Sequence, residues 1–231
     1  MPSSSSPFII RPATPSPTDL TFLLSTYDSS LPFLTSINNP HQWGSIPFSQ
    51  RGDFPTDTLT ELQSSEENRL TDTNTSTTNN LRIFIAEREY PSHPDDHIPL
   101  PPSTLRTTPN DKHFLPVGFV QVREDWVPGY VKAQTHLPIP EGGWVYLEVI
   151  ITDSRVESEL RQGAGRALID WVREFTRNRG KGVVWVDSWG EVGEDWLGGY
   201  YEEQGFRAVG EWSHERVGKT PWVGMLMKMD V

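Results

Sequence analysis

The stretch from Trp144 to about residue 178 constrains the fold of this chain more than any other part of it. Residues 144–151 read WVYLEVII, a nearly continuous apolar run that is typical of a central strand covered on both faces. A helix is expected from about Gly163, because apolar residues recur there at helical spacing: Leu168, Ile169, Val172 and Phe175. A buried strand, a glycine-containing turn and an amphipathic helix in this order indicate an α/β or α+β domain.

Further elements are expected on both sides of this stretch. Apolar runs predict strands at 8–11, 81–86, 117–122, 183–186 and 222–229. Helical spacing predicts helices that begin near Pro17 and cover about 56–70 and 194–204. Thr18 or Asp19 is placed to cap the first of these helices.

Two polar stretches interrupt the pattern. Residues 64–80 are dominated by Ser, Thr, Asn, Asp and Glu, and residues 91–116 are rich in Pro, His and Asp. Such segments bury too little apolar surface to form a core, so we expect two loop insertions there. We expect residues 1–7 to form a flexible Ser/Pro tail. The length of 231 residues suits a single domain over 8–231 that carries both insertions.

The composition narrows the classes of function. The formal net charge of −11 and the pI near 5.0 argue against nucleic acid or an anionic membrane as partner, and weakly favour a cationic substrate. The chain has no cysteine, which excludes disulfides, thiolate metal sites and a Cys nucleophile. The six His residues lack metal-ligand spacing, so no metal is expected. No stretch is long and apolar enough to span a bilayer, and a cytoplasmic protein is expected.

The turn before the central helix reads RQGAGRA from Arg161 to Ala167. Gly163 and Gly165 would let backbone amides approach an anion, and the positive end of the helix dipole would favour a phosphate or pyrophosphate. The alternative is that these glycines only allow close packing of the helix on the sheet.

This segment, followed by a strand and then YYEEQGF at 200–206, resembles the GNAT (GCN5-related) acetyltransferases in motif and spacing. The resemblance covers 117–231 and, less closely, 8–48. It implies a GNAT-like mixed, twisted central sheet of about six or seven strands flanked by helices. It also implies direct transfer of an acetyl group from acetyl-CoA, as co-substrate and without a metal, to an amine of a small molecule or peptide. The acceptor amine and the oligomeric state stay open.

The resemblance also implies which residues bind acetyl-CoA. Backbone groups of the central strand would bind pantetheine and the thioester oxygen: Val149, Ile150 and Ile151. The glycine turn would hold the pyrophosphate through Arg161, Gln162, Gly163, Ala164, Gly165, Arg166 and Ala167. Leu160 stands where the family usually has Arg or Gln, and Glu194 where it often has Asn. These departures motivate a rival interpretation, a catalytically silent acyl-CoA-binding or regulatory homologue. A nucleotide-binding module is a third, disfavoured by the lack of a Lys-Ser/Thr pair after the glycines.

Three residues are candidates for the chemistry. Tyr201 matches the Tyr that lies near the thioester sulfur in the family, and a phenol with a pKa near 10 can protonate a thiolate with a pKa of about 8.5. For Tyr200 we expect a packing role rather than a catalytic one. Glu148 is the first candidate for the base that deprotonates the amine, because a carboxylate in an apolar strand usually has a reason to be there. Its alternative role is a solvated strand residue, and Asp187 is the alternative base.

Four aromatic residues are candidates for the acceptor pocket. Trp43 and Phe48 follow the first helix, where the family commonly forms one wall of this pocket, and Trp126 and Trp189 are candidates for the other wall. Aromatic ring faces suit a cation. For each of the four, plain packing is the alternative.

Overall fold

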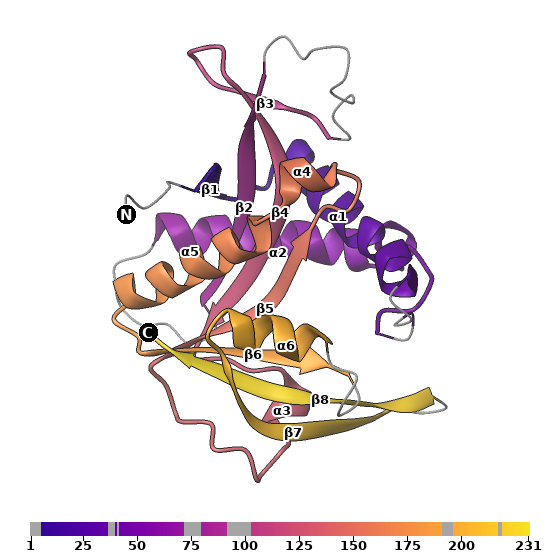
Figure 1. The fold of residues 1–231 in the computed structure, drawn as a ribbon, viewed down its shortest axis with the longest axis vertical. Coiled ribbons are helices and arrows are strands. Elements are labelled where there is room, and N and C mark those ends of the chain that lie inside the picture. Colours follow the sequence, from indigo (N-terminus) through magenta and orange to yellow (C-terminus); the bar gives the residue numbers. More distant parts are fainter. Residues whose placement is uncertain are drawn as a thin grey trace. The chain divides into compact units, whose positions relative to one another are not determined.

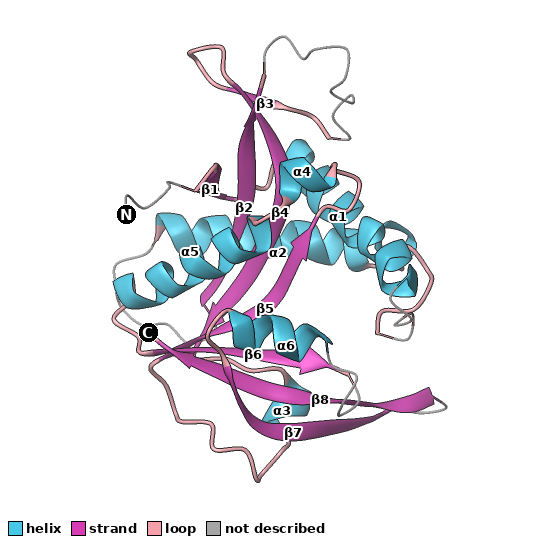
Figure 2. Ribbon diagram, viewed as in Figure 1, coloured by secondary structure: helices cyan, strands magenta, loops and turns pink. Residues whose placement is uncertain are grey.

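The computed structural model describes residues 6–36, 40, 42–71, 80–91, 103–190, 196–216 and 219–231. In this part of the chain the strands are β1 (Phe8–Pro12), β2 (Asn80–Tyr90), β3 (Arg106–Thr107), β4 (His113–Glu124), β5 (Trp144–Thr152), β6 (Val183–Trp189), β7 (Arg207–Arg216) and β8 (Lys219–Asp230). The helices are α1 (Pro17–Ser36), α2 (Phe54–Leu70), α3 (Gly129–Lys132), α4 (Ser158–Arg161), α5 (Ala164–Asn178) and α6 (Trp196–Glu203), with a 3₁₀ turn η1 (Phe48–Gln50) (Figures 1 and 2).

The strands form one mixed sheet in the order β1-β2-β4-β5-β6-β8-β7, with β3 paired to β4. β5 and β6 are parallel, whereas β1/β2, β3/β4, β6/β8 and β7/β8 are antiparallel. The expected mixed sheet flanked by helices is therefore confirmed. Its described part has eight strands rather than six or seven. Neither β3 nor β7 was predicted, because β3 is two residues long and β7 exposes most of its side chains, with Trp212 alone fully buried.

The described residues pack into two compact units, each built from separate stretches of chain. One unit lies within Met1–Asp72, Arg82–Gln121 and Val149–Leu168, and the other within Thr73–Leu81, Val122–Glu148 and Ile169–Val231. The single domain expected over 8–231 stays a prediction.

In the first unit, helices cover both faces of β2. The carboxylate of Glu87 is buried and pairs with Arg11 of β1 and with Arg106, while Arg11 also pairs with Asp19 of α1. The next residue, Arg88, points to the other face and donates to the carbonyl of Glu159 in α4 at 2.8 Å. Neighbouring strand residues point to opposite faces, so α1 and α4 lie on opposite sides of β2 (Figure 1).

The start of α1 differs in detail from the prediction. The hydroxyl of Ser16 accepts the amide N–H of Asp19 at 3.2 Å, and so Ser16 fills the capping role expected of Thr18 or Asp19. Asp19 instead uses its carboxylate on Arg11 and on the amide of Thr14.

The predicted insertions are partly ordered structure. Residues 64–70 belong to α2, where the buried Ser65 accepts the amide N–H of Ile83 at 2.9 Å. This hydrogen bond holds a Ser-rich stretch in place, although the polar composition of the stretch predicts a loop. Residues 113–116 belong to β4. Asn80 begins β2, and residues 103–112 of the second insertion are also described and include β3. The parts of the insertions at 72–79 and 92–102, like residues 1–5 of the tail, lie outside the described residues. No described helix has the length and apolar character needed to cross a bilayer.

Candidate functional site

The glycine turn lies in the first unit, between α4 and α5. Gly163 has φ = +87°, a conformation that residues with a Cβ rarely adopt, and this lets the chain reverse between the two helices. The amide of Gln162 donates to Ser158 at 2.8 Å and that of Ala167 to Gly163 at 3.0 Å. Within the described part of the chain, the amides of Gly163, Ala164 and Gly165 donate to no acceptor.

The first turn of α5 therefore presents unused N–H groups, as the first turn of a helix does by geometry. Gly163, Gln162 and Arg166 are exposed, which leaves the turn open to a ligand. The amides at the two ends of the cradle predicted over 162–167, those of Gln162 and Ala167, are bonded within the chain, and the cradle itself stays a prediction.

The C-terminal half of β5 also belongs to the first unit. Val149 and Ile150 point to opposite faces of the strand, yet both are half-buried, whereas Trp144 to Leu147 are fully buried. The first half of the strand is therefore covered on both faces as predicted, whereas residues 148–150 are only half-buried and Ile151 is buried again. Gly118 of β4 lies so close to this half that an added Cβ would stand 2.7 Å from the carbonyl oxygen of Ile151.

The two candidate bases lie in the second unit, at equivalent places on neighbouring parallel strands. The ladder between β5 and β6 ends with Leu147 opposite Val186, and Glu148 and Asp187 are the next residues. Glu148 is paired with Arg123 of β4, with 2.6 Å between Oε2 and Nε. The Arg123 guanidinium also lies 4.9 Å from the ring centroid of Trp126.

Asp187 has different partners. Its carboxylate accepts the hydroxyl of Tyr146 from β5 on one oxygen and that of Tyr130 from α3, at 3.1 Å, on the other. Burial raises the pKa of Asp187, and the negative charge of Glu148 adds to this, although the two hydroxyl donors oppose it. Burial likewise raises the pKa of both tyrosines, and the nearby charge of Asp187 raises it further.

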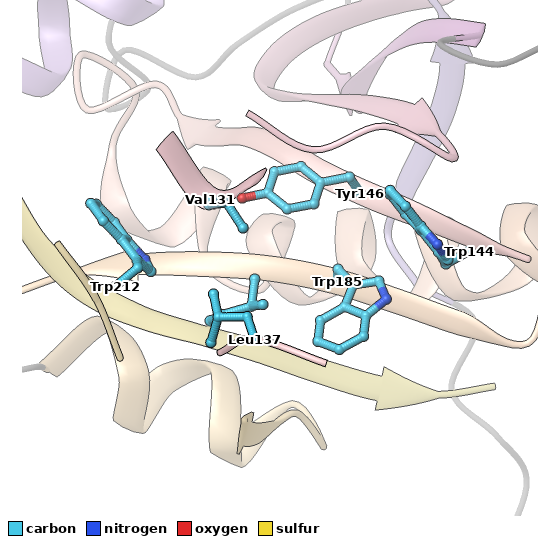
Figure 3. Close-up of a cluster of buried hydrophobic side chains, with 7 residues drawn as sticks. Val131, Leu137, Trp144, Tyr146, Trp185 and Trp212 are labelled. Atoms are coloured by element: carbon cyan, nitrogen blue, oxygen red, sulfur yellow. The ribbon is translucent and has the colours of Figure 1, made fainter. Parts of the chain in front are cut away.

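An aromatic core supports this carboxylate. Figure 3 shows the ring of Tyr146 with its hydroxyl directed toward Val131 of α3. The buried cluster to which both belong consists of Val131, Leu137, Trp144, Tyr146, Trp185, Trp212 and Leu226. Trp126 and Trp189, both half-buried, pack against it, and Trp126 meets the ring of Tyr146 edge-on at 5.8 Å. The indole N–H groups of Trp189 and Trp222 are buried without an acceptor among the described residues, and they are donors that a bound water or ligand could use.

The remaining predicted residues lie elsewhere. Trp43 and Phe48 are in the first unit, in contact with each other and with Tyr27. Tyr201 is buried in α6 of the second unit, where its ring meets Phe206 edge-on at 5.4 Å. The structure thus groups Trp126 and Trp189 with both candidate bases, and Trp43 with Phe48. The roles of all these residues stay predictions.

Three residues around the two candidate bases were not predicted from the sequence: Arg123, Tyr130 and Tyr146. Tyr146 could have been found, because it precedes Glu148 by two positions and so shares its face of the strand. Tyr130 lies in a single helical turn outside the sheet and carries no comparable signal. Among the described residues, no three His, Asp or Glu side chains gather in a way that could hold a metal ion.

No family model matches the sequence, and no curated protein matches it either. Solved structures do match. An N-acetyltransferase from Staphylococcus aureus Mu50 is 11% identical, with 97% of this chain and 99% of that chain covered and a TM-score of 0.54. The paia N-acetyltransferase from Thermoplasma acidophilum, in complex with coenzyme A, is 9% identical over 97% and 99% of the chains, with a TM-score of 0.53. The protein yncA from Salmonella typhimurium, with its cofactor acetyl-CoA, is 12% identical over 97% and 94%, with a TM-score of 0.52.

These similarities show that the chain has the fold of the GNAT acetyltransferases. The resemblance drawn from the glycine turn and the YYEEQGF segment is confirmed at the level of the fold.

Proposed function

We propose that the protein is an N-acetyltransferase that transfers the acetyl group of acetyl-CoA directly to an amine. The observation that carries this proposal is the open turn at Gly163 to Gly165, with unused amides at the start of α5, in a chain with the GNAT fold. Two proteins of similar structure were solved with coenzyme A or acetyl-CoA.

In this proposal, the amides of 163–165 hold the pyrophosphate at the positive end of the α5 dipole. Arg161 and Arg166 supply positive charge nearby, and Gln162, Ala164 and Ala167 shape the turn. The backbone of Val149 to Ile151 binds the pantetheine arm and the thioester oxygen, where an oxyanion donor stabilises the transition state.

The carboxylates of the second unit support an amine as the acceptor. Glu148 and Asp187 carry two negative charges against the one positive charge of Arg123, which favours a cation when both are ionised. One of the two takes a proton from the ammonium, because only the neutral amine attacks. Tyr201 then protonates the leaving thiolate. Trp126 and Trp189, which lie in the same unit as these carboxylates, are proposed to line the acceptor pocket, and the amine belongs to a small molecule or a peptide.

One observation favours a catalytically silent acyl-CoA-binding homologue as the second candidate. Tyr201 is only 3% exposed and packs on Phe206, as a purely structural tyrosine would. Binding of acetyl-CoA without acetylation of any amine would favour this candidate.

Calorimetric titration with acetyl-CoA tests the proposed binding site. We expect saturable binding by the wild type and about tenfold weaker binding by Gly165→Asp, since the new carboxylate would repel the pyrophosphate. An acidic residue in the first turn stabilises a helix, so this variant should keep its fold. Ala208→Asp adds the same charge at an exposed position of β7 and should bind as the wild type does.

Equal affinity of all three proteins would contradict the assigned turn. Lack of acetyl-CoA binding by the wild type would contradict the proposed function, and binding of ATP or NAD in its place would support a nucleotide-binding module.

A further inference from the structure

The carboxylate of Asp187 is held by two phenols that differ in their access to solvent. Tyr146 is fully buried, with 0% of its surface exposed, and therefore cannot touch an acceptor. Tyr130 is half-buried, and its hydroxyl lies 3.1 Å from Oδ2 of Asp187. Of the two hydroxyl groups that reach Asp187, only that of Tyr130 is on a side chain that a ligand could reach.

The segment 125–143, which carries Tyr130, is held by hydrogen bonds and an ion pair at its two ends and by further hydrogen bonds at Gln134. Asp125, at φ = +49°, accepts the amide of Gly143 at 2.8 Å and pairs with Lys181 at 2.5 Å, so it joins both ends of the segment 125–143. The side-chain amide of Gln134 donates to the carbonyls of Tyr130 and Ser213, which ties α3 to β7. Tyr130 is thus placed against Asp187 by contacts outside its own side chain.

Among the described residues, the side chains around the carboxylate of Asp187 include no cation that pairs with it. Within the described part of the chain, Asp187 forms no ion pair. Its residue opposite on β8 is the apolar Leu226. On β5 it faces Tyr146 and the charge of Glu148, which Arg123 pairs.

The other charged groups of the neighbouring elements lie against different partners. Lys228 of β8 lies 5.7 Å from the ring of Trp185, and α6, which also contacts β6, carries Glu202 and Glu203 exposed to solvent. His214 of β7 packs against the ring of Tyr130, with 5.9 Å between the two ring centroids. This contact is with the ring of Tyr130 and not with the hydroxyl group that donates to Asp187.

We propose that Tyr130 is a catalytic residue that relays the proton of the acceptor ammonium to Asp187, and that Tyr146 is the positioning residue of Asp187. The inference rests on the proposed acetyl transfer and assigns Asp187, rather than Glu148, as its base.

The relay balances without any further reactant. The ammonium N–H donates its proton to the Tyr130 oxygen while the Tyr130 hydroxyl proton passes to Oδ2 of Asp187. The products are a neutral amine, a neutral tyrosine and a protonated Asp187, and Tyr146 keeps its proton throughout on its bond to Oδ1. Both phenols hold their protons firmly because burial and Asp187 raise their pKa, so the exchange is concerted and forms no free tyrosinate.

Two measurements on wild type, Tyr130→Phe, Tyr146→Phe and the control Tyr90→Phe test the relay. The first follows the titration of Asp187 by NMR of its labelled carboxyl carbon, which needs no activity. Each hydroxyl stabilises the ionised carboxylate, so its removal should raise the pKa of Asp187 in Tyr130→Phe and in Tyr146→Phe, but not in Tyr90→Phe. An unchanged titration in Tyr130→Phe would overturn the relay.

The second measurement is the pH profile of acetyl transfer, with acetyl-CoA binding measured in parallel. Both variants should bind acetyl-CoA as the wild type does. In Tyr146→Phe the rising limb of the profile should shift to higher pH and the rate at high pH should recover. In Tyr130→Phe the turnover should stay about a hundredfold low at every pH, the usual size of a lost proton transfer.

Full turnover of Tyr130→Phe beside an active wild type would overturn the relay alone. A wild type that turns over no amine would instead contradict the proposed function, and with it the need for a relay.

Discussion

At the residue scale, three carboxylates with different partners illustrate how surroundings assign roles. Glu148 pairs with a guanidinium. Asp187 instead accepts hydrogen bonds from two phenols and forms no ion pair with any described residue. Asp19 accepts Arg11 through two bonds of 2.7 and 2.8 Å and also the amide of Thr14. A carboxylate fully paired with a cation stabilises the fold, whereas one with only neutral donors is better able to take up a proton.

The pairing of Asp19 predicts a pH-dependent contribution to stability. Burial alone would raise its pKa, but Arg11 and Thr14 hold it below the ordinary value of 3.8. A depressed pKa in the folded state gives stability that is present above the unfolded pKa and is lost as the pH falls through the folded pKa. Asp19→Asn should therefore lower the free energy of unfolding by about 3 kcal/mol at pH 7, because it leaves part of Arg11 unpaired.

Urea unfolding at pH 7 and at pH 3 measures this effect. The difference between wild type and Asp19→Asn should shrink at the lower pH. Asp170→Asn breaks an exposed i,i+3 pair and should cost no more than about 0.5 kcal/mol at either pH. An equal loss in the two variants, or a loss independent of pH, would contradict the assigned role of Asp19.

Only some residues of the candidate site could be predicted from the sequence. Glu148 and Asp187 stood out because a carboxylate next to a buried apolar run is unusual. Arg123 and the two tyrosines did not, because their importance depends on which strands lie side by side. That pairing is a tertiary property, and Tyr130 reaches Asp187 from a segment that no periodicity describes.

At the scale of elements, Gly118 shows how closely β4 and β5 approach. A Cβ added there would lie 2.7 Å from the Ile151 oxygen and 3.1 Å from the Cα of Thr152, both backbone atoms that cannot rotate away. Gly118→Ala should therefore destabilise the fold by about 1–3 kcal/mol, the usual cost of overpacking. Thermal or urea unfolding measures it.

Gly182→Ala is the matched control, since an added Cβ at residue 182 would meet nothing within 4 Å. It should leave the free energy of unfolding within about 0.5 kcal/mol of wild type. A Gly118→Ala protein as stable as Gly182→Ala would show that the two strands can separate at this point without cost.

The burial of each element also explains which helices and strands could be predicted from the sequence. Strands with a buried apolar run, such as β5 and β6, and the strongly amphipathic α5 were predicted close to their observed bounds. β7 was missed because it has no apolar run: most of its side chains are exposed, and it buries little beyond Trp212. The end of α2 appeared polar because a single buried hydroxyl, that of Ser65, replaces apolar contact there.

At the scale of the whole molecule, the order of elements and two motifs, the glycine turn and the YYEEQGF segment, sufficed to predict the GNAT fold. The sheet order places β5 between β4 and β6, so the glycine turn follows a strand in the middle of the sheet. The net charge of −11 is a property of this scale too, and it favours a cationic acceptor over the polyanionic partners that basic proteins bind. The identity of the proposed acceptor is not specified by strand order alone.

The most direct test of the proposed acetyl transfer is thiol release from acetyl-CoA by the purified protein, measured across polyamines, amino acids, arylamines and peptides. We expect saturable release with one class of amine, accompanied by the mass of its acetylated product. Release should also rise with pH, because the base loses its proton. Acetyl-CoA binding with no release on any amine would contradict the proposed acetyl transfer and leave a protein that kept the GNAT fold without its chemistry.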